Sequence, residues 1–254
     1  MSRNVLADLN ENWAAWLHFT AEHAAGGASR TFGAIRCSSV GVPIPLFNQA
    51  FVFAEPDPDD MASAIRWLSS RSVPFWVTAP DTVASAVAGM AESVGLDPTA
   101  TTQPGMAFAP LSDLPGPDSD VEMLPVTDAT QLADFAVVAA EAFGAPLEAA
   151  SVLAPASSLA DDRCSWFVGY VDGDPGVCGQ LLRTDDVAGV YSIGVCERFR
   201  RRGLGAAITT TVLSAGSDLG CTIGVLQASP MGEAVYEHMG FDTVTQYHSF
   251  AASD

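Results

Sequence analysis

The stretch Val187–Thr211 reads VAGVYSIGVCERFRRRGLGAAITTT, and its pattern predicts a strand, a turn and a helix. The apolar run Val187–Val195 has the length and composition of a buried strand. A charged turn follows it, and a helical pattern begins behind Gly203-Leu204-Gly205. Such an arrangement presents backbone N–H groups and the positive end of a helix dipole, so we expect this stretch to bind phosphate.

Two common phosphate-binding motifs do not fit this stretch. No Lys-Ser/Thr pair follows the glycines, which excludes the Walker pattern. The glycines also do not form GxGxxG after a strand, which excludes a Rossmann fingerprint. The spacing Arg200-x-x-Gly203-x-Gly205 instead resembles the Arg/Gln-x-x-Gly-x-Gly/Ala pyrophosphate loop of the GNAT superfamily of acyl-CoA N-acyltransferases.

A second motif, LQASPMGEAVYEHMGF at Leu226–Phe241, strengthens this resemblance. In GNAT proteins the strand after the loop helix ends near an Asn, and the next helix carries a Tyr before a Gly-Phe turn. Tyr236, Gly240 and Phe241 match this pattern, whereas Ser229 stands at the Asn position. The two motifs, in this order and at this spacing, extend the resemblance over about the last half of the chain.

The spacing of apolar residues predicts the other elements of the second half. A helix over Leu204–Leu219 would join the parallel strands Val187–Val195 and Ile223–Gln227 by a right-handed crossover. Further elements are expected at Val121–Pro125 (strand), Asp128–Phe143 (helix, with Phe143 inward), Pro146–Leu153 (helix), Cys164–Val171, Val177–Arg183 and Thr243–Ala251 (strands). The last of these is expected to close the sheet of the second half.

The first half repeats this element order without the motifs. The element order and spacing of Leu46–Pro80 match those of the stretch around Val187–Thr211. The arginine-glycine loop is replaced there by Glu55-Pro56-Asp57-Pro58-Asp59-Asp60. Carboxylates there would repel a pyrophosphate, and no glycine allows close backbone approach. Ala91 stands opposite Tyr236. Further elements are expected at Val5–Ala24, Asp60–Ser69 with Asp59 or Asp60 as N-cap, and Thr82–Val94 (helices), and at Ala34–Val40, Phe47–Phe53, Phe75–Thr78 and Thr102–Leu111 (strands).

The resemblance therefore implies an α/β (α+β) protein of two GNAT-like units. Each would be a mixed, mostly antiparallel twisted sheet flanked by helices, with splayed parallel strands at the cofactor cleft. We predict a degenerate GNAT-like domain at 1–112, a linker rich in Pro, Gly and Asp at 113–120, and a catalytic domain at 121–254.

The composition limits the partners and the location. The net charge is −19, with no lysine, which argues against nucleic acid because phosphate neutralisation needs a basic face. A GC-rich genome or a salt-loving source would each produce such a composition, and the missing lysine and excess of Asp favour the second. No signal peptide or membrane span is predicted, and the five cysteines suggest reduced buried thiols rather than a metal site. We therefore expect a cytoplasmic protein.

The resemblance also implies where coenzyme A would bind. Its pantetheine would pair with the backbone of Ile193 and Val195 along the splayed strand. Its pyrophosphate would contact the loop, with Arg200 or Arg201 pairing with the phosphates. Glu197 stands where Pro is common and Arg201 where Gly is common, so the shape of the loop backbone stays open. The expected cofactor-binding residues are Ile193, Val195, Arg200, Arg201, Arg202, Gly203, Leu204, Gly205, Ala206 and Ser229.

Tyr236 is the catalytic residue that the resemblance implies. A phenol with a pKa of about 10 can donate a proton to a departing thiolate while it is neutral. A core tyrosine that packs under the Gly-Phe turn is the structural alternative. The base is not identified, although Glu141 and Glu148 lie in helices that usually border the acceptor site.

The resemblance therefore implies an acetyl-CoA-dependent N-acetyltransferase, with no metal, that acts on a primary amine of a small molecule or peptide. The alternative is a non-catalytic CoA-binding or regulatory module that keeps the fold. Neither nucleic acid nor a membrane is expected as a partner, and a monomer and a homodimer both remain open.

Overall fold

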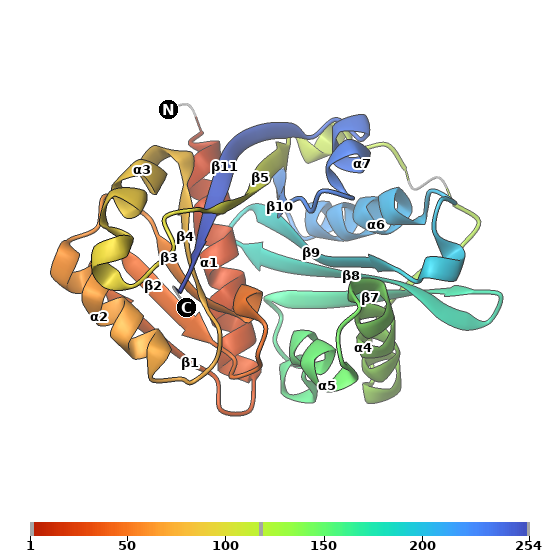
Figure 1. The fold of residues 1–254 in the computed structure, drawn as a ribbon. Helices are drawn as coiled ribbons and strands as arrows, with labels where there is room; N and C mark the ends of the chain where they lie inside the picture. The colour runs from red at the N-terminus through yellow and green to blue at the C-terminus, as the bar shows by residue number, and fades with distance from the viewer. Residues whose placement is uncertain (1–2, 117–118, 253–254) are drawn as a thin grey trace. The chain divides into compact units, whose positions relative to one another are not determined.

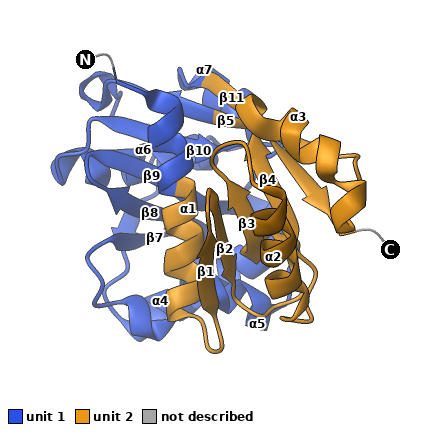
Figure 2. Ribbon diagram, turned by 90° about the vertical axis from the view of Figure 1, so that its left-hand side faces the viewer, with its two compact units in different colours: residues 1–12, 106–242 blue, residues 13–105, 243–254 orange. Residues whose placement is uncertain are grey.

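The computed structural model describes residues 3–116 and 119–252, and its ribbon is shown in Figure 1. The chain folds into two compact units, coloured separately in Figure 2. Unit 1 comprises residues 1–12 and 106–242, and unit 2 comprises residues 13–105 and 243–254. Each unit is therefore built from separate segments of the sequence. Helix α1 (Val5–His23) and strand β5 (Thr101–Phe108) both run from one unit into the other.

Unit 1 is a mixed sheet with helices on both faces. Its strands lie in the order β10-β9-β8-β7-β6, and only β9 and β10 are parallel. The strands are β6 (Met123–Pro125), β7 (Cys164–Val171), β8 (Asp174–Thr184), β9 (Val187–Val195) and β10 (Ile223–Gln227). The helices are α4 (Ala129–Phe143), α5 (Leu147–Ala150), α6 (Leu204–Asp218) and α7 (Glu233–His238), with short turns η3 (Leu111–Asp113), η4 (Ser151–Leu153), η5 (Ala156–Ser158) and η6 (Glu197–Phe199).

Small residues on the strands let helices α4 and α6 cover opposite faces of this sheet (Figure 1). A Cβ at Gly179 would lie 2.7 Å from Ile208 of α6, and a Cβ at Gly194 would lie 2.9 Å from Ala142 of α4. Both helices therefore approach the backbone closely. The predicted bounds of β7, β9 and β10 are confirmed to the residue, because each is a continuous apolar run that ends at a polar or glycine-containing turn.

Helix α4 shows how local chemistry sets the helix ends. The carboxylate of Asp128 accepts the N–H groups of Thr130 and Gln131 at 2.8 and 2.9 Å, and Gly144 closes the helix with φ of 63°. The predicted inward orientation of Phe143 is wrong, because its side chain is 51% exposed. It is the last residue of the helix, and the chain turns away at Gly144.

Unit 2 contains the same strand-helix-strand pattern in a smaller sheet. Its strands lie in the order β1-β2-β3-β4-β11, with β3 and β4 parallel around helix α2. The apolar face of α2 packs into a core of buried aliphatic and aromatic side chains. The strands are β1 (Ala28–Phe32), β2 (Ile35–Ser39), β3 (Asn48–Val52), β4 (Trp76–Pro80) and β11 (Asp242–Ala251). The helices are α2 (Pro58–Ser69) and α3 (Asp81–Met90), with turns η1 (Pro45–Phe47) and η2 (Glu92–Val94).

The last strand does not close the sheet of the second half as predicted. β11 pairs antiparallel with β4, in the register Tyr247↔Pro80 to Ala251↔Trp76, so it belongs to unit 2. Tyr247 and Phe250 are buried in this unit. The periodicity of a strand predicts its burial but not its neighbour, which explains the error. The division into two repeated domains on either side of the linker at 113–120 stays a prediction. The compact units of the structure each combine segments from both halves of the sequence, so they do not test where one repeat ends and the next begins.

Two details of unit 2 also differ from expectation. The N-cap of α2 is Asp57, whose carboxylate accepts from the N–H groups of Asp59 and Asp60, and the helix begins at Pro58, where proline is favoured. Strand β1 was not predicted, because its central residues are exposed and polar and give no apolar alternation. The five cysteines are free and buried, as expected.

Candidate active site

The gap between β9 and β10 defines the site. These strands pair only over Ile223↔Val187, Gly224↔Ala188 and Val225↔Gly189. β9 then continues to Val195 and β10 to Gln227 without further pairing between them. The strands splay apart beyond these pairs, as predicted, and leave one edge of β9 open.

The register of β9 shows which backbone groups face this gap. The N–H of Cys196 donates to the carbonyl of Gly176 on the β8 side, and Gly194 is paired with Cys178. Because backbone groups alternate in direction along an antiparallel strand, those of Val195 point away from β8. Ile193 lies at a shift of the register opposite Gly179 and lines the cavity. An extended ligand lying in the gap would meet these groups, as the predicted pantetheine contacts require.

A cavity of about 410 Å³ opens at the splayed edge, entirely within unit 1. Tyr236 and every predicted cofactor-binding residue except Arg202 line it. None of the described lining residues is Asp or Glu, although the chain carries a net charge of −19. The lining residues are Ala142, Phe143, Ile193, Gly194, Val195, Arg200, Arg201, Gly203, Leu204, Gly205, Ala206, Ser229, Met231, Gly232, Val235 and Tyr236.

Some of these lining residues were not foreseen. Phe143, Met231 and Val235 form an apolar rim, with exposures of 51%, 71% and 39%. Exposed apolar side chains cannot be told from core ones by periodicity, because they also fall at helical spacing. Ala142 and Gly194 line the cavity only because α4 packs closely on β9, which is a tertiary contact.

The N-terminus of α6 has unoccupied backbone N–H groups that could bind an anion. Its N-cap, Gly203, has φ of 73° and no side-chain cap, and its first turn contains no acidic residue. The first helical bond is from the N–H of Ala207 to the carbonyl of Gly203. The N–H groups before it have no acceptor in the helix and carry the positive end of the dipole. A Cβ at Gly205 would meet nothing within 4 Å, so the backbone there can be approached closely.

The three loop arginines have different surroundings. Arg200 is half-buried and donates from Nε to the carbonyl of Val195 and from Nη2 to the carbonyl of Ala142, both at 3.1 Å. Arg201 is exposed and lines the cavity, with φ of 62°. This left-handed conformation explains why glycine is common at its position. Arg202 is not among the lining residues, and its guanidinium lies 6.0 Å from the ring centre of Phe199, so the structure does not place it at the predicted contact.

Tyr236 lies on α7 with its ring packed tightly. The side chain is 8% exposed, and a Cβ at Gly232 would lie 2.9 Å from its Cε2. Burial raises the pKa of Tyr236 to about 12, and a hydrogen bond with Thr209 acts in the opposite direction. The phenol is therefore neutral near pH 7 and can donate a proton into the cavity. The structural alternative is present as well, since the ring centre lies 5.7 Å from that of Phe241.

Ser229 has a local role in the turn before α7. Its Oγ accepts the N–H of Gly232 at 3.2 Å, and its carbonyl accepts the N–H groups of Gly232 and Glu233. A short polar side chain at this position therefore stabilises the turn that carries Tyr236. Ser229 also lines the cavity, so the predicted contact with a cofactor stays open to test.

The two candidate bases do not line the cavity. Burial raises the pKa of Glu141, but hydrogen bonds from Arg198 Nη1, at 3.0 and 2.7 Å, lower it, and the net direction is down. Glu141 is thus held as a carboxylate by an arginine. Glu148 is exposed on α5. His248 bonds Asp81 at 2.7 Å within unit 2 and is not among the lining residues.

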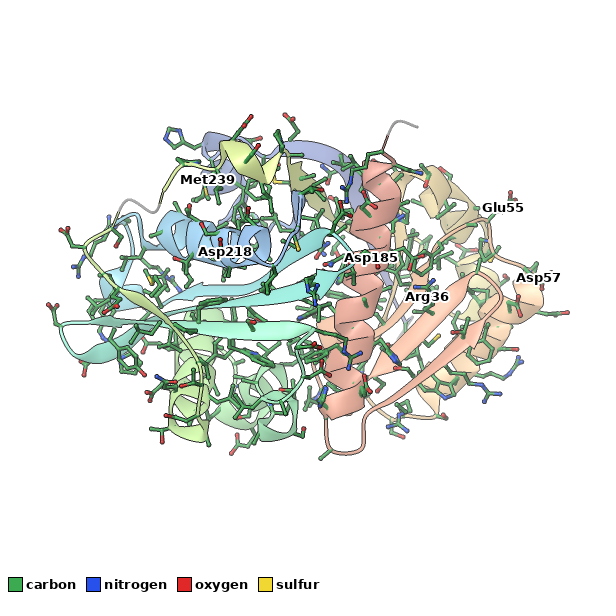
Figure 3. All side chains as sticks on the ribbon, turned by 180° about the vertical axis from the view of Figure 1, so that it is seen from behind. Arg36, Glu55, Asp57, Asp185, Asp218 and Met239 are labelled. Atoms are coloured by element: carbon green, nitrogen blue, oxygen red, sulfur yellow. The ribbon has the colours of Figure 1, made fainter. Side chains whose placement is uncertain are left out.

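The matching turn in unit 2 has the opposite character. Glu55 and Asp57 are exposed before α2, and Figure 3 shows their side chains. The Asp57 carboxylate takes the first N–H donors of the helix, and Asp59 and Asp60 add negative charge to its first turn. Ala91, opposite Tyr236 in the repeat, is fully buried. We therefore still expect this helix end to disfavour anions.

The described residues contain neither a metal-binding cluster nor a single helix suited to cross a membrane. No group of three or more His, Cys, Asp or Glu side chains within residues 3–116 and 119–252 is placed to hold a metal ion. In the same ranges no single helix has the length and apolar character to cross a membrane. One bent pair, Ala129–Phe143 with Leu147–Ser158, passes that test jointly.

Comparisons with known proteins agree with this geometry. Residues 132–241 match the Acetyltransferase (GNAT) family. The structure is similar to a GCN5-related N-acetyltransferase from Kribbella flavida, with a TM-score of 0.72 and 17% identity, covering 95% of this chain and 94% of that one. It is also similar to a tandem GNAT protein from the clavulanic acid biosynthesis pathway, with a TM-score of 0.59 and 14% identity, covering 97% and 95%. No curated protein matches the sequence.

Proposed function

From the match of residues 132–241 to the Acetyltransferase (GNAT) family, and from the similarity of the fold to GNAT structures, we propose that the chain moves an acetyl group from acetyl-CoA to a primary amine. One observation carries the proposal. The uncapped N-terminus of α6, the open edge of β9 and the hydroxyl-bearing Tyr236 all line one cavity. Donors for a pyrophosphate, a strand edge for a pantetheine and a proton donor for a thiolate are thus brought together.

The residues present fit coenzyme A. The free N–H groups of Leu204 to Ala206 and the guanidinium of Arg201 would hold its phosphates. The space beside Gly205, which a side chain would fill, admits the pyrophosphate to the helix backbone. The backbone of Ile193 and the N–H of Val195, whose carbonyl is taken by Arg200, would bond the pantetheine amides. Coenzyme A, when bound, supplies the activated thioester.

The chain's own part in the transfer is proton movement and positioning. The attacking amine must be neutral, although a lysine-like amine has a pKa of about 10.4. No Asp, Glu or His lines the described cavity, so we propose that solvent or the acceptor's own surroundings remove this proton. The open backbone N–H groups of β9 would stabilise the oxyanion. Tyr236 would then protonate the departing thiolate.

The test is release of free thiol from acetyl-CoA in the presence of a panel of primary amines. Small polyamines, amino acids and peptides with a free N-terminus should be included, because the cavity lining contains no carboxylate that would select cations. Amine-dependent thiol release, with a product heavier by one acetyl group, supports the proposal. Binding of CoA without turnover of any amine would favour the non-catalytic module, which the absence of a base among the lining residues also favours.

We also propose that the protein works in a salty cytoplasm, from its charge of −19 and its lack of lysine. Self-repulsion of surface carboxylates weakens as the Debye length falls from about 10 Å at 0.1 M salt to about 3 Å at 1 M. The melting temperature should therefore rise steeply with KCl. A melting temperature that is flat or falls with salt would instead leave genome composition as the explanation.

A further inference from the structure

The side chain of Arg200 joins two elements that both line the cavity. Its Nε donates to the carbonyl of Val195, at the end of β9, and its Nη2 donates to the carbonyl of Ala142, in the last turn of α4. Both bonds are 3.1 Å long, and the side chain is half-buried. Val195 and Ala142 both line the cavity.

Each of these carbonyls would otherwise lack a partner. The last carbonyls of a helix have no acceptor role within it. In α4 the carbonyls of Ala140 and Glu141 are taken by the N–H groups of Gly144 and Ala145, but this C-cap does not reach Ala142. The carbonyl of Val195 points into the gap that β10 leaves open. A guanidinium satisfies both carbonyls at once and also places a positive charge at the negative end of the α4 dipole.

The neighbouring Arg201 is arranged differently. Its backbone is left-handed, with φ of 62°. Its side chain is exposed and lines the cavity. Across the described ranges, no side-chain hydrogen bond or ion pair holds its guanidinium. One arginine of the loop is thus committed to protein carbonyls, and the next one is available to a ligand.

We infer that Arg200 is a positioning residue for the apolar rim of the cavity, and that Arg201 is the side chain that meets the phosphates. Arg200 holds the end of α4 against the open edge of β9. That end carries Phe143, whose Cζ lies 3.6 Å from the place of a Cβ on Gly194, so the position of the apolar rim depends on this attachment. The assignment of Arg201 rests on the proposed binding of coenzyme A, whereas the attachment by Arg200 does not.

Arg198 offers a matched control. It also links the same loop to the same turn of α4, through Glu141 at 2.7 Å. The two side chains are 48% and 38% exposed, and exposed ion pairs contribute little. Arg198→Met therefore removes a nearby arginine without removing the buried attachment.

The first experiment uses the protein without ligand. Amide hydrogen exchange should be measured in the wild type and in Arg200→Met, Arg200→Gln, Arg201→Gln and Arg198→Met. Arg200→Met should accelerate exchange at Gly144 and Ala145 by about tenfold or more, because the last turn of α4 frays. Arg200→Gln keeps an N–H donor at the place of Nε, so its exchange rates at Gly144 and Ala145 should lie between those of the wild type and those of Arg200→Met. The Arg201 and Arg198 variants should match the wild type.

The second experiment measures CoA affinity by calorimetry from low to high salt. Arg201→Gln should weaken binding roughly tenfold at low salt, and its ratio to the wild type should approach one near ~1 M salt, where single charges are screened. Arg200→Met should weaken binding at every salt concentration by a constant factor, because it alters geometry rather than charge. Arg200→Gln should restore part of that loss.

Several results would overturn the inference. If both Arg200 variants lose affinity equally, with a loss that disappears at high salt, Arg200 is a phosphate ligand. If exchange at the end of α4 is unchanged in Arg200→Met, the attachment does not hold the helix. If the wild type fails to bind CoA at all, the proposed function and the role of Arg201 fail, while the exchange experiment still decides the role of Arg200.

Discussion

Single residues in the cavity divide into those that bind, those that position and those that react. Gly203 and Gly205 expose backbone donors, Arg200 holds two walls together, and Tyr236 carries the only hydroxyl among the described lining residues besides that of Ser229. Ser229 is occupied in capping its turn. The proposed chemistry thus depends on one side chain, which makes it open to a direct test.

Tyr236→Phe keeps the ring and its packing, so the stability should change by only about 1 kcal/mol. Loss of a general acid should lower kcat by ~10²–10⁴, with kcat/KM falling together with it and CoA affinity nearly unchanged. Because burial raises the pKa of Tyr236 to about 12, the acid stays protonated through ordinary assay conditions, and its deprotonation should cause no loss of kcat below about pH 11. Steady-state kinetics over pH, beside calorimetry, checks this. A Phe variant with near-normal kcat would reduce Tyr236 to a packing residue.

Gly205→Ala separates stability from binding. Its Cβ would meet nothing in the protein, and replacing a helical glycine by alanine typically adds ~0.5–1 kcal/mol of stability. The loop motif that the sequence resembles accepts Ala as well as Gly at this position, so CoA affinity should stay close to that of the wild type. Gly216→Ala is the control, since its Cβ would lie 2.6 Å from Ala188 and should destabilise the fold without reaching the cavity. Thermal melts and calorimetry give both readouts, and a Gly205→Ala variant that melts below the wild type would contradict the open space beside Gly205.

At the scale of elements, the same strand-helix-strand unit occurs twice with opposite electrostatics. Helix α6 begins with glycine and no acidic side chain, whereas α2 begins with Asp57, Asp59 and Asp60. The dipole of a helix favours anions at its N-terminus only when the donors there are unoccupied. Unit 2, which contains the first half of the repeat, therefore keeps the scaffold and lacks the anion site.

One CoA per chain should bind as a result. Calorimetry should give a stoichiometry near one, and Gly203→Asp should abolish binding by placing a carboxylate at the N-terminus of α6. The matching change in unit 2, Asp57→Asn, should leave CoA binding unaltered, because it keeps a cap on a helix that has no proposed ligand. A stoichiometry near two would mean that α2 binds as well.

For the whole molecule, the discontinuity of the units has consequences for folding. Unit 1 includes residues 1–12, and Asn12 is fully buried there. Its side chain donates to Thr184 at 2.8 Å and accepts from the hydroxyl of Tyr191 at 2.7 Å. β11, at the other end of the chain, pairs with β4 of unit 2. Neither unit can be completed by one continuous half of the sequence.

A fragment of residues 121–254 should therefore fail to fold cooperatively. It would leave Tyr191 without its buried partner and would expose the apolar side of β11 without β4. Near-UV circular dichroism and thermal melts should show a molten or aggregated state, whereas the full chain melts cooperatively. A monomeric, cooperative and active fragment would show that the catalytic domain is independent of the first half.

Much of the fold and site could be read from the order of residues alone. Val187–Val195 and Ile223–Gln227 are continuous apolar runs, and the helix behind Gly203 begins at a signal that depends only on neighbouring residues. Local chemistry of this kind determines where strands, turns and helix ends lie. The backbone donors of the loop are also local, because they all lie within the first turn of the helix that follows. The family, the splayed strands and the position of Tyr236 follow from these signals.

Only the tertiary structure decided which surfaces meet. The partner of β11, the two carbonyls bound by Arg200 and the exposed position of Phe143 depend on contacts between residues far apart in the chain. Periodicity shows that a face is apolar but not which element will cover it. The sequence of a loop likewise does not show whether its arginine binds a phosphate or a backbone carbonyl. Those choices depend on distances that exist only once the sheet has assembled, because they bring together groups separated by tens of residues.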